Sequence, residues 1–404
     1  MTSSLSSKLY DVAIVGSGPA GSSGALCLAR QGMKVVIIEK DALPRYKTCG
    51  GGVTYRAIQL LPVDVQEAIE LECYTAELNL LDAGLHFSTR RQGPIVSMTR
   101  RDKFDFLLVS AAKDAGADVL PECKVIDIIT QADEVELVTN KGSLLARFVV
   151  AADGAMSLIA RKTGWQETRY LAPALVCEVS VSYDVLRRFS RAARFDFGVV
   201  PCGYAWVFPK KGHLSIGVLC MRRTSINLKE MFERYVRILG ISNILGLKRH
   251  GFLIPVSPRQ DIFVKGRVLL TGDAAGLADP VTGEGITFAI QSGQIAARAL
   301  LEGDFEEGRV KQAYDSALAK NILPELQSGR VLAKLIYDYP RMRTWLFRLY
   351  GQELSEAVTD VFMGKRTYDG ILHNPLNYLR LFGFMWLKHK KRAHGTNNTV
   401  FKPP

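Results

Sequence analysis

The segment Tyr10–Gly24, YDVAIVGSGPAGSSG, constrains the fold of this chain more than any other. Val12–Val15 is an apolar run of the kind typical of a buried parallel strand. Gly16, Gly18 and Gly21 follow with the spacing G-x-G-x-x-G, and a stretch with helical periodicity comes next. These glycines allow a tight turn, close approach of the backbone to a pyrophosphate and close helix–strand packing. The pattern predicts a dinucleotide-binding βαβ unit, although a purely structural βαβ turn has the same outline.

The two ends of this unit indicate which groups would hold the cofactor. Pro19 and Ala20 fall at the start of the expected helix, where free N–H groups and the helix dipole favour phosphate. A second apolar run, Val35–Ile38, ends at Glu39, whose carboxylate can accept hydrogen bonds from ribose hydroxyls. Besides the three glycines, the predicted site therefore includes Pro19, Ala20, Glu39 and its neighbour Lys40.

Length and charge limit the remaining possibilities. A chain of 404 residues can bury a large core and is long enough for two or three lobes. Its net charge of +12 favours an anionic partner, namely nucleic acid, a phosphorylated substrate or an anionic membrane surface, or else serves general solubility. No run of about 18 apolar residues is present, which argues against a membrane-spanning helix.

The cysteines and the N-terminus bear on the cellular compartment. Seven scattered cysteines, an odd number without a C-x-x-C pair, argue against a disulfide framework and against a zinc site. The segment Met1–Lys8 is Ser-rich and lacks the apolar stretch of a signal peptide. The sequence therefore predicts a cytoplasmic protein without a metal site.

A glycine-rich loop is expected between residues 41 and 53. Cys49 is followed by three consecutive glycines, Gly50–Gly52, which disfavour the interior of a helix or strand. Such a backbone can pass close to a flat, bulky group such as a flavin ring. An ordinary mobile surface loop would have the same composition.

The pattern of apolar residues divides the chain into alternating segments. Buried-strand and helix patterns predict a Rossmann-type α/β nucleotide-binding domain made of residues 1–75, 100–172 and 261–305. Short alternating strands over 76–99 and 173–260 predict an inserted antiparallel-sheet domain suited to cover a substrate. Residues 306–404 are predicted to form a C-terminal helical region.

A second glycine-rich segment carries a resemblance to a known superfamily. The stretch Gly266–Gly276, GRVLLTGDAAG, with Asp279-Pro280 and Gly283–Ile286 after it, resembles the second FAD motif of flavoproteins of the p-hydroxybenzoate hydroxylase type. Asp153-Gly154 with Ser157 resembles their third motif, although Arg161 falls one position later than the usual arginine. The resemblance implies that the cofactor is FAD.

The same resemblance implies roles for several residues. Asp273 is expected to bind the ribitol chain, and Arg101 to lie near the phosphates. The helix that begins after Gly283 is expected to point its N-terminus at the pyrimidine edge of the flavin. There the helix dipole would stabilise the negative charge of a reduced flavin. The remaining residues assigned to the FAD site are Val125, Gly285 and Ile286.

Two further segments resemble the geranylgeranyl reductase family within this superfamily. They are Pro44–Gly52, PRYKTCGGG, and Pro201–Lys210, PCGYAWVFPK, which contains a Y-x-W-x-F-P strand. Tyr204, Trp206 and Phe208 alternate along that strand and so project from one face of it. Three aromatic side chains on one face can line an apolar tunnel or fill a core, and the resemblance implies substrate contact.

The resemblance implies an FAD-dependent reductase that saturates isolated carbon–carbon double bonds of a polyprenyl lipid. Hydride from the reduced flavin would reach one alkene carbon and a proton the other, in a dry pocket, because an unactivated alkene is a poor hydride acceptor. Cys49 is the candidate catalytic residue, although a thiol with a pKa of about 8.5 is a weak acid. Gly50 and Gly51 are expected to lie at the flavin. The electron donor is expected to be NADPH or a ferredoxin-like protein.

Two other functions are compatible with the FAD motifs. A flavin-dependent monooxygenase or halogenase would share them and would consume oxygen as it formed product. A non-catalytic flavin-binding membrane module would bind FAD without reducing any prenyl lipid.

The segment Pro375–Arg392 bears on where the protein acts. Apolar and aromatic residues precede a basic cluster of Lys388, Lys390, Lys391 and Arg392. This order is similar to an interfacial membrane anchor, and also to a core-packing helix with a solvated basic end. Together with the net charge, it predicts a peripheral protein on the cytoplasmic face of a membrane, with a polyprenyl lipid and not nucleic acid as its partner.

Overall fold

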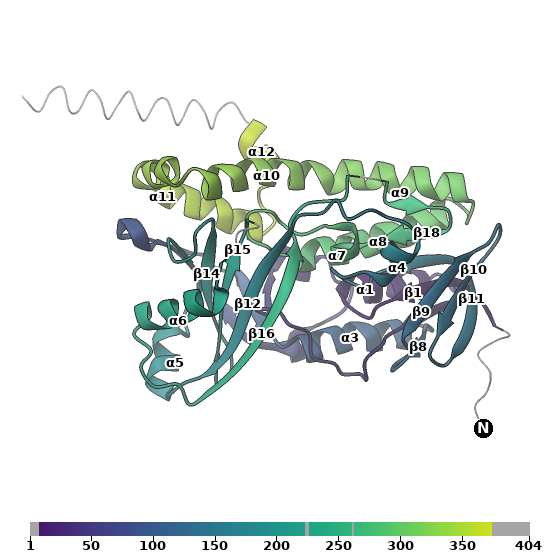
Figure 1. The fold of residues 1–404 in the computed structure, drawn as a ribbon, viewed down its shortest axis with the longest axis horizontal. Coiled ribbons are helices and arrows are strands. Elements are labelled where there is room, and N and C mark those ends of the chain that lie inside the picture. The colour runs from purple at the N-terminus through teal and green to yellow at the C-terminus, as the bar shows by residue number, and fades with distance from the viewer. Residues whose placement is uncertain (1–7, 223–225, 261, 374–404) are drawn as a thin grey trace, which may run out of the picture.

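The structure is a computed structural model that describes residues 8–222, 226–260 and 262–373. The predicted membrane segment Pro375–Arg392 lies outside these ranges. Within them, no helix combines the length and the apolar character needed to cross a bilayer. Two large sheets lie side by side, and a layer of C-terminal helices runs along both of them (Figure 1).

The first sheet has the Rossmann-type arrangement predicted from the glycine motif. Its strand order is β17-β18-β11-β1-β2-β8, with β10 pairing β11 and β9. The pairs β1–β2, β1–β11, β2–β8 and β11–β18 are parallel. Strands of a parallel sheet covered by helices are buried on both faces, which explains the continuous apolar runs. The strands are β1 Leu9–Val15, β2 Val35–Ile38, β8 Asp118–Leu120, β9 Val125–Thr130, β10 Val135–Thr139, β11 Gly142–Ala151, β17 Val264–Lys265 and β18 Val268–Leu270.

Helix α1 packs against two other helices of this domain, α3 and α8. The contact with α8 is close because small residues meet there. A Cβ placed on Gly24 would lie 3.0 Å from the Gly293 carbonyl oxygen, and one on Gly293 would overlap the Ala20 carbonyl oxygen. The glycines therefore bring the start of α1 against α8. The helices are α1 Pro19–Ala29, α3 Arg101–Asp114, α4 Leu158–Lys162, α7 Gly272–Ala275 and α8 Ile286–Glu302.

The second sheet has seven strands in the order β16-β12-β15-β14-β13-β5-β6. Its neighbours are antiparallel except for β13 and β5, a parallel pair that the antiparallel prediction did not anticipate. Because β5 comes from an earlier segment of the chain, no hairpin fixes its direction relative to β13. The strands are β5 Thr75–Leu80, β6 Leu85–Arg90, β12 Leu171–Ser180, β13 Ala193–Phe197, β14 Gly203–Pro209, β15 Leu214–Cys220 and β16 Gly246–Pro255.

The two faces of the seven-stranded sheet are covered by different helices. One face packs on α5 Tyr183–Phe189 and α6 Leu228–Ile238, with Phe232 and Tyr235 of α6 buried. The other face packs against Tyr337 and Phe347 of the C-terminal helices. These helices are α9 Glu307–Asn321, α10 Leu323–Asp338, α11 Pro340–Phe362 and α12 Tyr368–His373.

A small third sheet follows the glycine-rich loop, and its strands lie on either side of β5 and β6 in the chain. Its strands are β3 Gly52–Thr54, β7 Val96–Thr99 and β4 Ile69–Cys73, in the order β3-β7-β4. Thr54 ends β3 and caps the short helix α2, Tyr55–Gln59, by accepting a hydrogen bond from the Ala57 N–H. A 3₁₀ turn, Gln66–Ala68, precedes β4, and a second, Leu81–Ala83, joins β5 and β6 of the seven-stranded sheet.

Candidate active site

The three glycines after β1 differ in what surrounds them. A Cβ on Gly16 would overlap the Ala152 carbonyl oxygen, and one on Gly21 would overlap the Gly16 carbonyl oxygen. Beside Gly18, in contrast, the nearest atom is 3.7 Å away, in the Arg45 guanidinium. Gly18 precedes α1, whose N-terminus is capped by no side chain among the described residues. Backbone N–H groups at this turn therefore remain available to an anion.

Glu39, at the end of β2, is buried and heavily hydrogen-bonded. It accepts hydrogen bonds from the backbone N–H and the hydroxyl of Ser17, at 3.1 and 2.6 Å, and from the Arg45 Nε at 2.9 Å. Burial raises the pKa of Glu39, but the charge of Arg45 and the hydrogen bonds of Ser17 outweigh it and hold that pKa below the ordinary range. Glu39 is therefore an ionised acceptor beside the glycine turn.

Arg45 links this turn to the glycine-rich loop. Its NH1 lies 3.2 Å from the Asp105 carboxylate, which in turn receives two hydrogen bonds from Arg101, at 2.8 and 2.9 Å. Burial lowers the pKa of Arg101, but Asp105 and Cys49 outweigh it, so that the pKa lies above its usual value. A series of ion pairs, Glu39–Arg45–Asp105–Arg101, thus extends from the Gly18 turn to Cys49. Arg45 has no signal of its own in the sequence beyond its place in the motif PRYKTCGGG.

Two other predicted residues lie at the edge of this region. Lys40 is exposed directly after Glu39. Val125 is buried at the start of β9, in a segment held to Glu39 by a hydrogen bond of 2.8 Å from the Cys123 N–H to the Glu39 carbonyl. Lys40 and Val125 therefore both lie close to Glu39 along the backbone.

The second and third motifs meet the first at the end of β1. A Cβ on Gly272 would lie 3.2 Å from the Ala20 side chain. Arg169 joins the two later motifs by donating hydrogen bonds to the carbonyl oxygens of Asp273, at 2.5 Å, and Ala155, at 2.7 Å. Burial raises the pKa of Asp153, and its Oδ1 has no hydrogen-bond partner among the described residues. An unpaired buried oxygen beside the glycine turn is consistent with a site for a polar ligand.

The turn before α8 presents the other predicted FAD residues. Gly283 has a φ of +70°, which favours glycine, and Gly285 is the N-cap of α8, which starts at Ile286. The carboxylate of Asp273 lies 3.3 Å from a Cβ placed on Gly285. Asp273 and the N-terminus of α8 are therefore neighbours, as the resemblance to the second FAD motif implies.

The glycine-rich loop packs against the aromatic strand β14. A Cβ on Gly50 would lie 3.0 Å from the Trp206 Nε1, and one on Gly52 would lie 3.0 Å from the Phe208 ring. The Gly51 N–H donates a hydrogen bond of 3.3 Å to the Cys49 Sγ. The two segments that resemble the geranylgeranyl reductase family, far apart in the sequence, thus form one contact.

The three aromatic residues of β14 form a continuous series. Successive ring centroids lie 6.0 Å apart for Tyr204 and Trp206 and 6.2 Å apart for Trp206 and Phe208. Tyr204 and Trp206 are buried, and Phe208 is partly exposed. The Trp206 Nε1 is buried without a hydrogen-bond partner among the described residues. The Tyr204 hydroxyl donates a hydrogen bond to the Thr282 carbonyl, which connects this aromatic series to the turn before α8.

Lys210, directly after β14, fixes the loop from the other side. Its Nζ is buried and donates hydrogen bonds of 2.9 Å to the Gly51 carbonyl and 2.8 Å to the Thr99 carbonyl. Burial lowers the pKa of Lys210 to about 8. Lys210 ends the motif PCGYAWVFPK, and the sequence pattern indicates no function for it.

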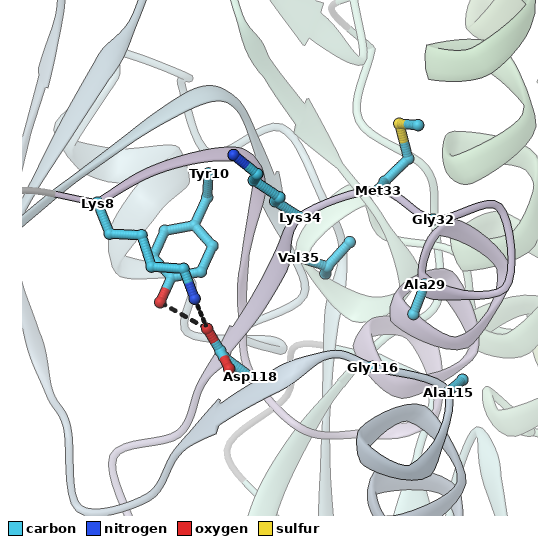
Figure 2. A pocket seen from close by; sticks show the side chains of 10 residues that line it. All are labelled: Lys8, Tyr10, Ala29, Gly32, Met33, Lys34, Val35, Ala115, Gly116 and Asp118. Carbon is cyan, nitrogen blue, oxygen red and sulfur yellow. Dashed lines mark hydrogen bonds and ion pairs between the residues drawn. The ribbon is translucent and has the colours of Figure 1, made fainter.

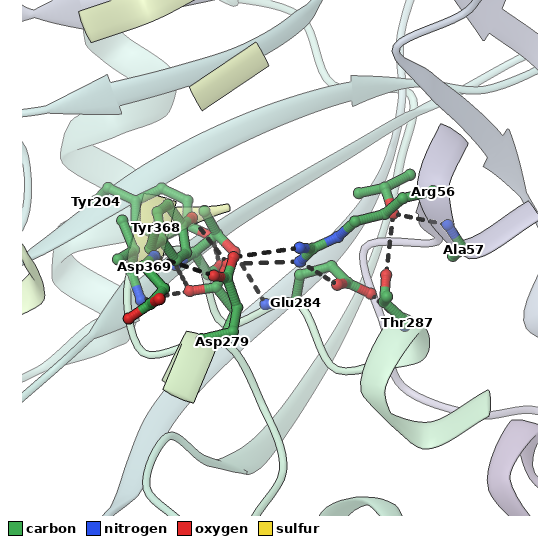
Figure 3. Close-up of polar contacts among 12 residues, drawn as sticks. Arg56, Ala57, Tyr204, Asp279, Glu284, Thr287, Tyr368 and Asp369 are labelled. Carbon is green, nitrogen blue, oxygen red and sulfur yellow. Dashed lines mark hydrogen bonds and ion pairs between the residues drawn. The ribbon is translucent and has the colours of Figure 1, made fainter. Parts of the chain in front are cut away.

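A buried charge network around Arg56 holds the turn before α8 in place (Figure 3). Arg56 lies 3.4 Å from the Glu284 carboxylate and 3.9 Å from that of Asp279. Asp279 also accepts hydrogen bonds from the Tyr368 hydroxyl at 2.9 Å and the Val281 N–H at 2.7 Å. The network thus connects α2, the turn 279–285 and the C-terminal helix α12.

A cavity of about 260 Å³ lies elsewhere, at the opposite end of the parallel sheet (Figure 2). It is bordered by residues at the starts of β1, β2 and β8, including Tyr10, Val35 and Asp118. Lys8 and Tyr10 both bond to the Asp118 carboxylate there. Since doubly wound sheets bind nucleotides at the carboxyl ends of their strands, this cavity is not the dinucleotide site.

The residues at the carboxyl ends of the strands fit FAD. The turn at Gly18 leaves room and free N–H groups for phosphates, Glu39 offers an ionised acceptor, and Asp273 adjoins the N-terminus of α8. The family described as "FAD binding domain" matches residues 9–313.

Curated relatives match most of the chain. Digeranylgeranylglycerophospholipid reductase 2 of Methanothermobacter thermautotrophicus is 31% identical over 350 residues, covering 81% of this chain and 88% of that protein. The chloroplastic geranylgeranyl diphosphate reductase of Nicotiana tabacum is 28% identical over 403 residues, covering 92% and 83%.

Among solved structures, a geranylgeranyl bacteriochlorophyll reductase-like protein of Thermoplasma acidophilum has a TM-score of 0.74 with 23% identity. The match covers 93% of this chain and 99% of that one. A flavin-dependent brominase has a TM-score of 0.69 at 20% identity and covers 96% of this chain, which shows a shared fold. The chain belongs to the geranylgeranyl reductase family of flavoproteins with an FAD binding domain.

Proposed function

We propose that this protein is an FAD-dependent reductase that saturates isolated carbon–carbon double bonds in the prenyl chain of a lipid. The observation that carries the proposal is the contact of Gly50 and Gly52 with Trp206 and Phe208. It joins a loop suited to a flavin ring to an aromatic surface suited to a prenyl chain. The names of the relatives, which refer to geranylgeranyl diphosphate and to a digeranylgeranyl glycerophospholipid, support this substrate class.

The groups of the protein that would hold FAD lie along the line described above. The turn at Gly18 would receive the phosphates, Glu39 the ribose and Asp273 the ribitol chain, with the N-terminus of α8 stabilising negative charge on the bound ring. When bound and in its reduced form, FAD would supply the hydride for one alkene carbon.

The protein's part in the reaction is to exclude water, to orient the chain and to provide a proton. Tyr204 and Trp206 are buried, so a double bond bound against their rings would be shielded from water. Cys49 lies beside Gly51 and contacts Arg101, and we assign it as the proton donor to the second alkene carbon. Lys210 holds the loop that carries Cys49 in position.

We also propose that the protein works as a peripheral protein on the cytoplasmic face of a membrane, because its substrate is insoluble. The net charge of +12 supports attraction to anionic lipid. NADPH or a ferredoxin-like protein would supply the electrons.

The test uses purified protein reconstituted with FAD. The protein should be yellow and release FAD on denaturation. Reduced with dithionite under nitrogen, it should convert geranylgeranyl lipids dispersed in detergent into products that mass spectrometry shows to carry two more hydrogen atoms per double bond. Cys49→Ala should lower turnover and retain FAD, whereas Cys27→Ala, a matched change in α1, should leave turnover intact. Product formation only with oxygen would instead indicate a monooxygenase or halogenase, and bound FAD with no product would indicate a non-catalytic module.

A further inference from the structure

The outer face of α11 exposes a combination of side chains unusual for a water-facing helix. Met342 is 42% exposed and Trp345 is 50% exposed, and Tyr339, at the corner between α10 and α11, is 46% exposed. Arg341 and Arg348 are exposed on the same helix. We call Arg341, Met342, Trp345 and Arg348 the α11 stripe. Large apolar side chains gathered in this way mark an interaction surface.

The exposure of the stripe follows from how α11 packs. Residues 341, 345 and 348 follow the helical spacing of one face. Arg343 and Phe347, on the opposite face, are buried, and Arg343 donates a hydrogen bond of 3.0 Å to the Asp82 carboxylate. The helix is therefore held against the sheet by its inner face, and the stripe lies on its exposed face. Helix α11 belongs to the layer of C-terminal helices in Figure 1.

The charges around the stripe favour an anionic partner. The neighbouring acid Asp338 forms an ion pair with Arg222, and Asp82 is engaged by Arg343, so neither cancels the charge of Arg341 or Arg348. Farther along, α11 is kinked at Tyr350, and beyond the kink Glu353 and Glu356 are exposed. On α11 itself, the exposed positive charge thus lies in the part before the kink.

The inner face of the same helix leads to the aromatic strand. Phe347 contacts Phe197 with ring centroids 6.2 Å apart, Phe197 contacts Tyr204 at 5.8 Å, and Tyr204 contacts Trp206 at 6.0 Å. An unbroken series of aromatic rings therefore runs from just beneath the α11 stripe to the glycine-rich loop.

We propose that the α11 stripe docks this protein on an anionic lipid bilayer, next to the aromatic series through which a prenyl chain would reach Trp206. Tryptophan and tyrosine favour the headgroup level of a bilayer, methionine enters the acyl boundary, and arginine pairs with lipid phosphates. The proposal deepens the proposed function, since it assigns the surface at which a lipid substrate would be collected.

The experiment measures sedimentation of FAD-loaded, full-length protein with vesicles of phosphatidylglycerol or of phosphatidylcholine, at low salt. The variants are Met342→Ser/Trp345→Ser and Arg341→Gln/Arg348→Gln. The matched control is Leu245→Ser, which alters a leucine of the inserted domain that is 64% exposed. Wild type and control should bind phosphatidylglycerol vesicles, and each double variant should bind at least about tenfold more weakly.

Activity separates this proposal from the proposed function. With substrate dispersed in detergent, the stripe variants should turn over like wild type, and with substrate in phosphatidylglycerol vesicles they should be slower. If wild type shows no activity but its vesicle binding depends on the stripe, the docking proposal stands and the reductase proposal fails. The docking proposal is overturned if the stripe variants bind vesicles as wild type does, or if the control loses as much vesicle binding as they do. It is also overturned if the stripe mediates self-association and has no effect on vesicle binding.

Discussion

The Lys210 Nζ and the Gly51 carbonyl oxygen lie 2.9 Å apart in a hydrogen bond that ties the inserted sheet to the glycine-rich loop. The same ammonium donates to the Thr99 carbonyl of β7, so one buried cation holds three segments together. Among the described residues, the ammonium donates hydrogen bonds to two backbone carbonyls and to no carboxylate. This arrangement makes the loop sensitive to any change at Lys210.

Lys210→Met should destabilise the protein increasingly as the pH rises. In the wild type, the pKa of Lys210 is lowered to about 8 from an ordinary value of 10.5. Between these two values the unfolded state binds more protons than the folded state, so the wild type gains stability as the pH rises. The gap in unfolding free energy between wild type and Lys210→Met should widen by up to about 3 kcal/mol across that window. Denaturant titrations at pH 7 and pH 10 measure it, and a constant gap would contradict the buried ammonium.

Glu39→Gln should weaken FAD binding by roughly ten- to a hundredfold, the usual loss for a hydrogen bond to a charged group. The control is Lys40→Gln, which alters the exposed neighbour. Because the pKa of Glu39 is lowered in the folded protein, its ionised form also contributes to folding stability. That contribution is complete above the ordinary glutamate pKa of 4.5 and is lost as the pH falls through the lowered value. Fluorescence titration with FAD measures the affinity, and equal effects of the two variants would remove Glu39 from the site.

Trp206→Phe should lower turnover of long prenyl substrates while leaving the flavin spectrum unchanged. Since the Trp206 Nε1 has no partner among the described residues, the change removes no hydrogen bond there and should cost less than about 1.5 kcal/mol of stability. Trp206→Ala should lower turnover further. Steady-state kinetics with short and long prenyl chains, beside thermal melts, test this. Lost stability with unaltered kinetics would show that the aromatic residues of β14 only fill a core.

Arg56→Met should destabilise the protein by about 3–5 kcal/mol, because it leaves buried carboxylates uncompensated. The milder Tyr368→Phe removes one hydrogen bond to the Asp279 carboxylate and should cost about 1.5–3 kcal/mol. Both changes act on the turn before α8, so FAD retention should fall in the same order. Unfolding titrations and retained flavin absorbance measure the two effects, and a neutral Arg56→Met would contradict the network as a support of the turn.

Replacing Lys388, Lys390, Lys391 and Arg392 with glutamine should reduce binding to anionic vesicles, because each cation near such a surface contributes about 1 kcal/mol. Raising the salt concentration should release the wild type in part. The variant should retain FAD, which serves as the control for folding. If it binds vesicles as wild type does, the basic cluster has no part in attachment.

The sequence alone determined the local features that depend on backbone geometry. The triplet Gly16, Gly18 and Gly21 predicts the turn after β1. No other residue fits at Gly16 and Gly21, beside the Ala152 and Gly16 carbonyls, whereas the space beside Gly18 is open. The apolar run Val35–Ile38 predicts a parallel strand because both faces of that strand are covered. Glu39 and Asp273 could be placed by their spacing from such turns, as could the start of α8 at Ile286.

Only the tertiary structure decided which distant segments meet. No local signal pairs β13 with β5 in parallel, and the strand β16 and helix α5 were not predicted, because β16 lies half-exposed at the sheet edge and its pattern is weak. The partners of Arg45, Arg56 and Lys210 are likewise set by long-range packing. The sequence around a charged residue does not show whether its side chain is buried or which groups it contacts. The contact of Gly50 with Trp206 joins residues whose distance along the chain gives no clue to their proximity, and folding of the inserted sheet over the loop creates it.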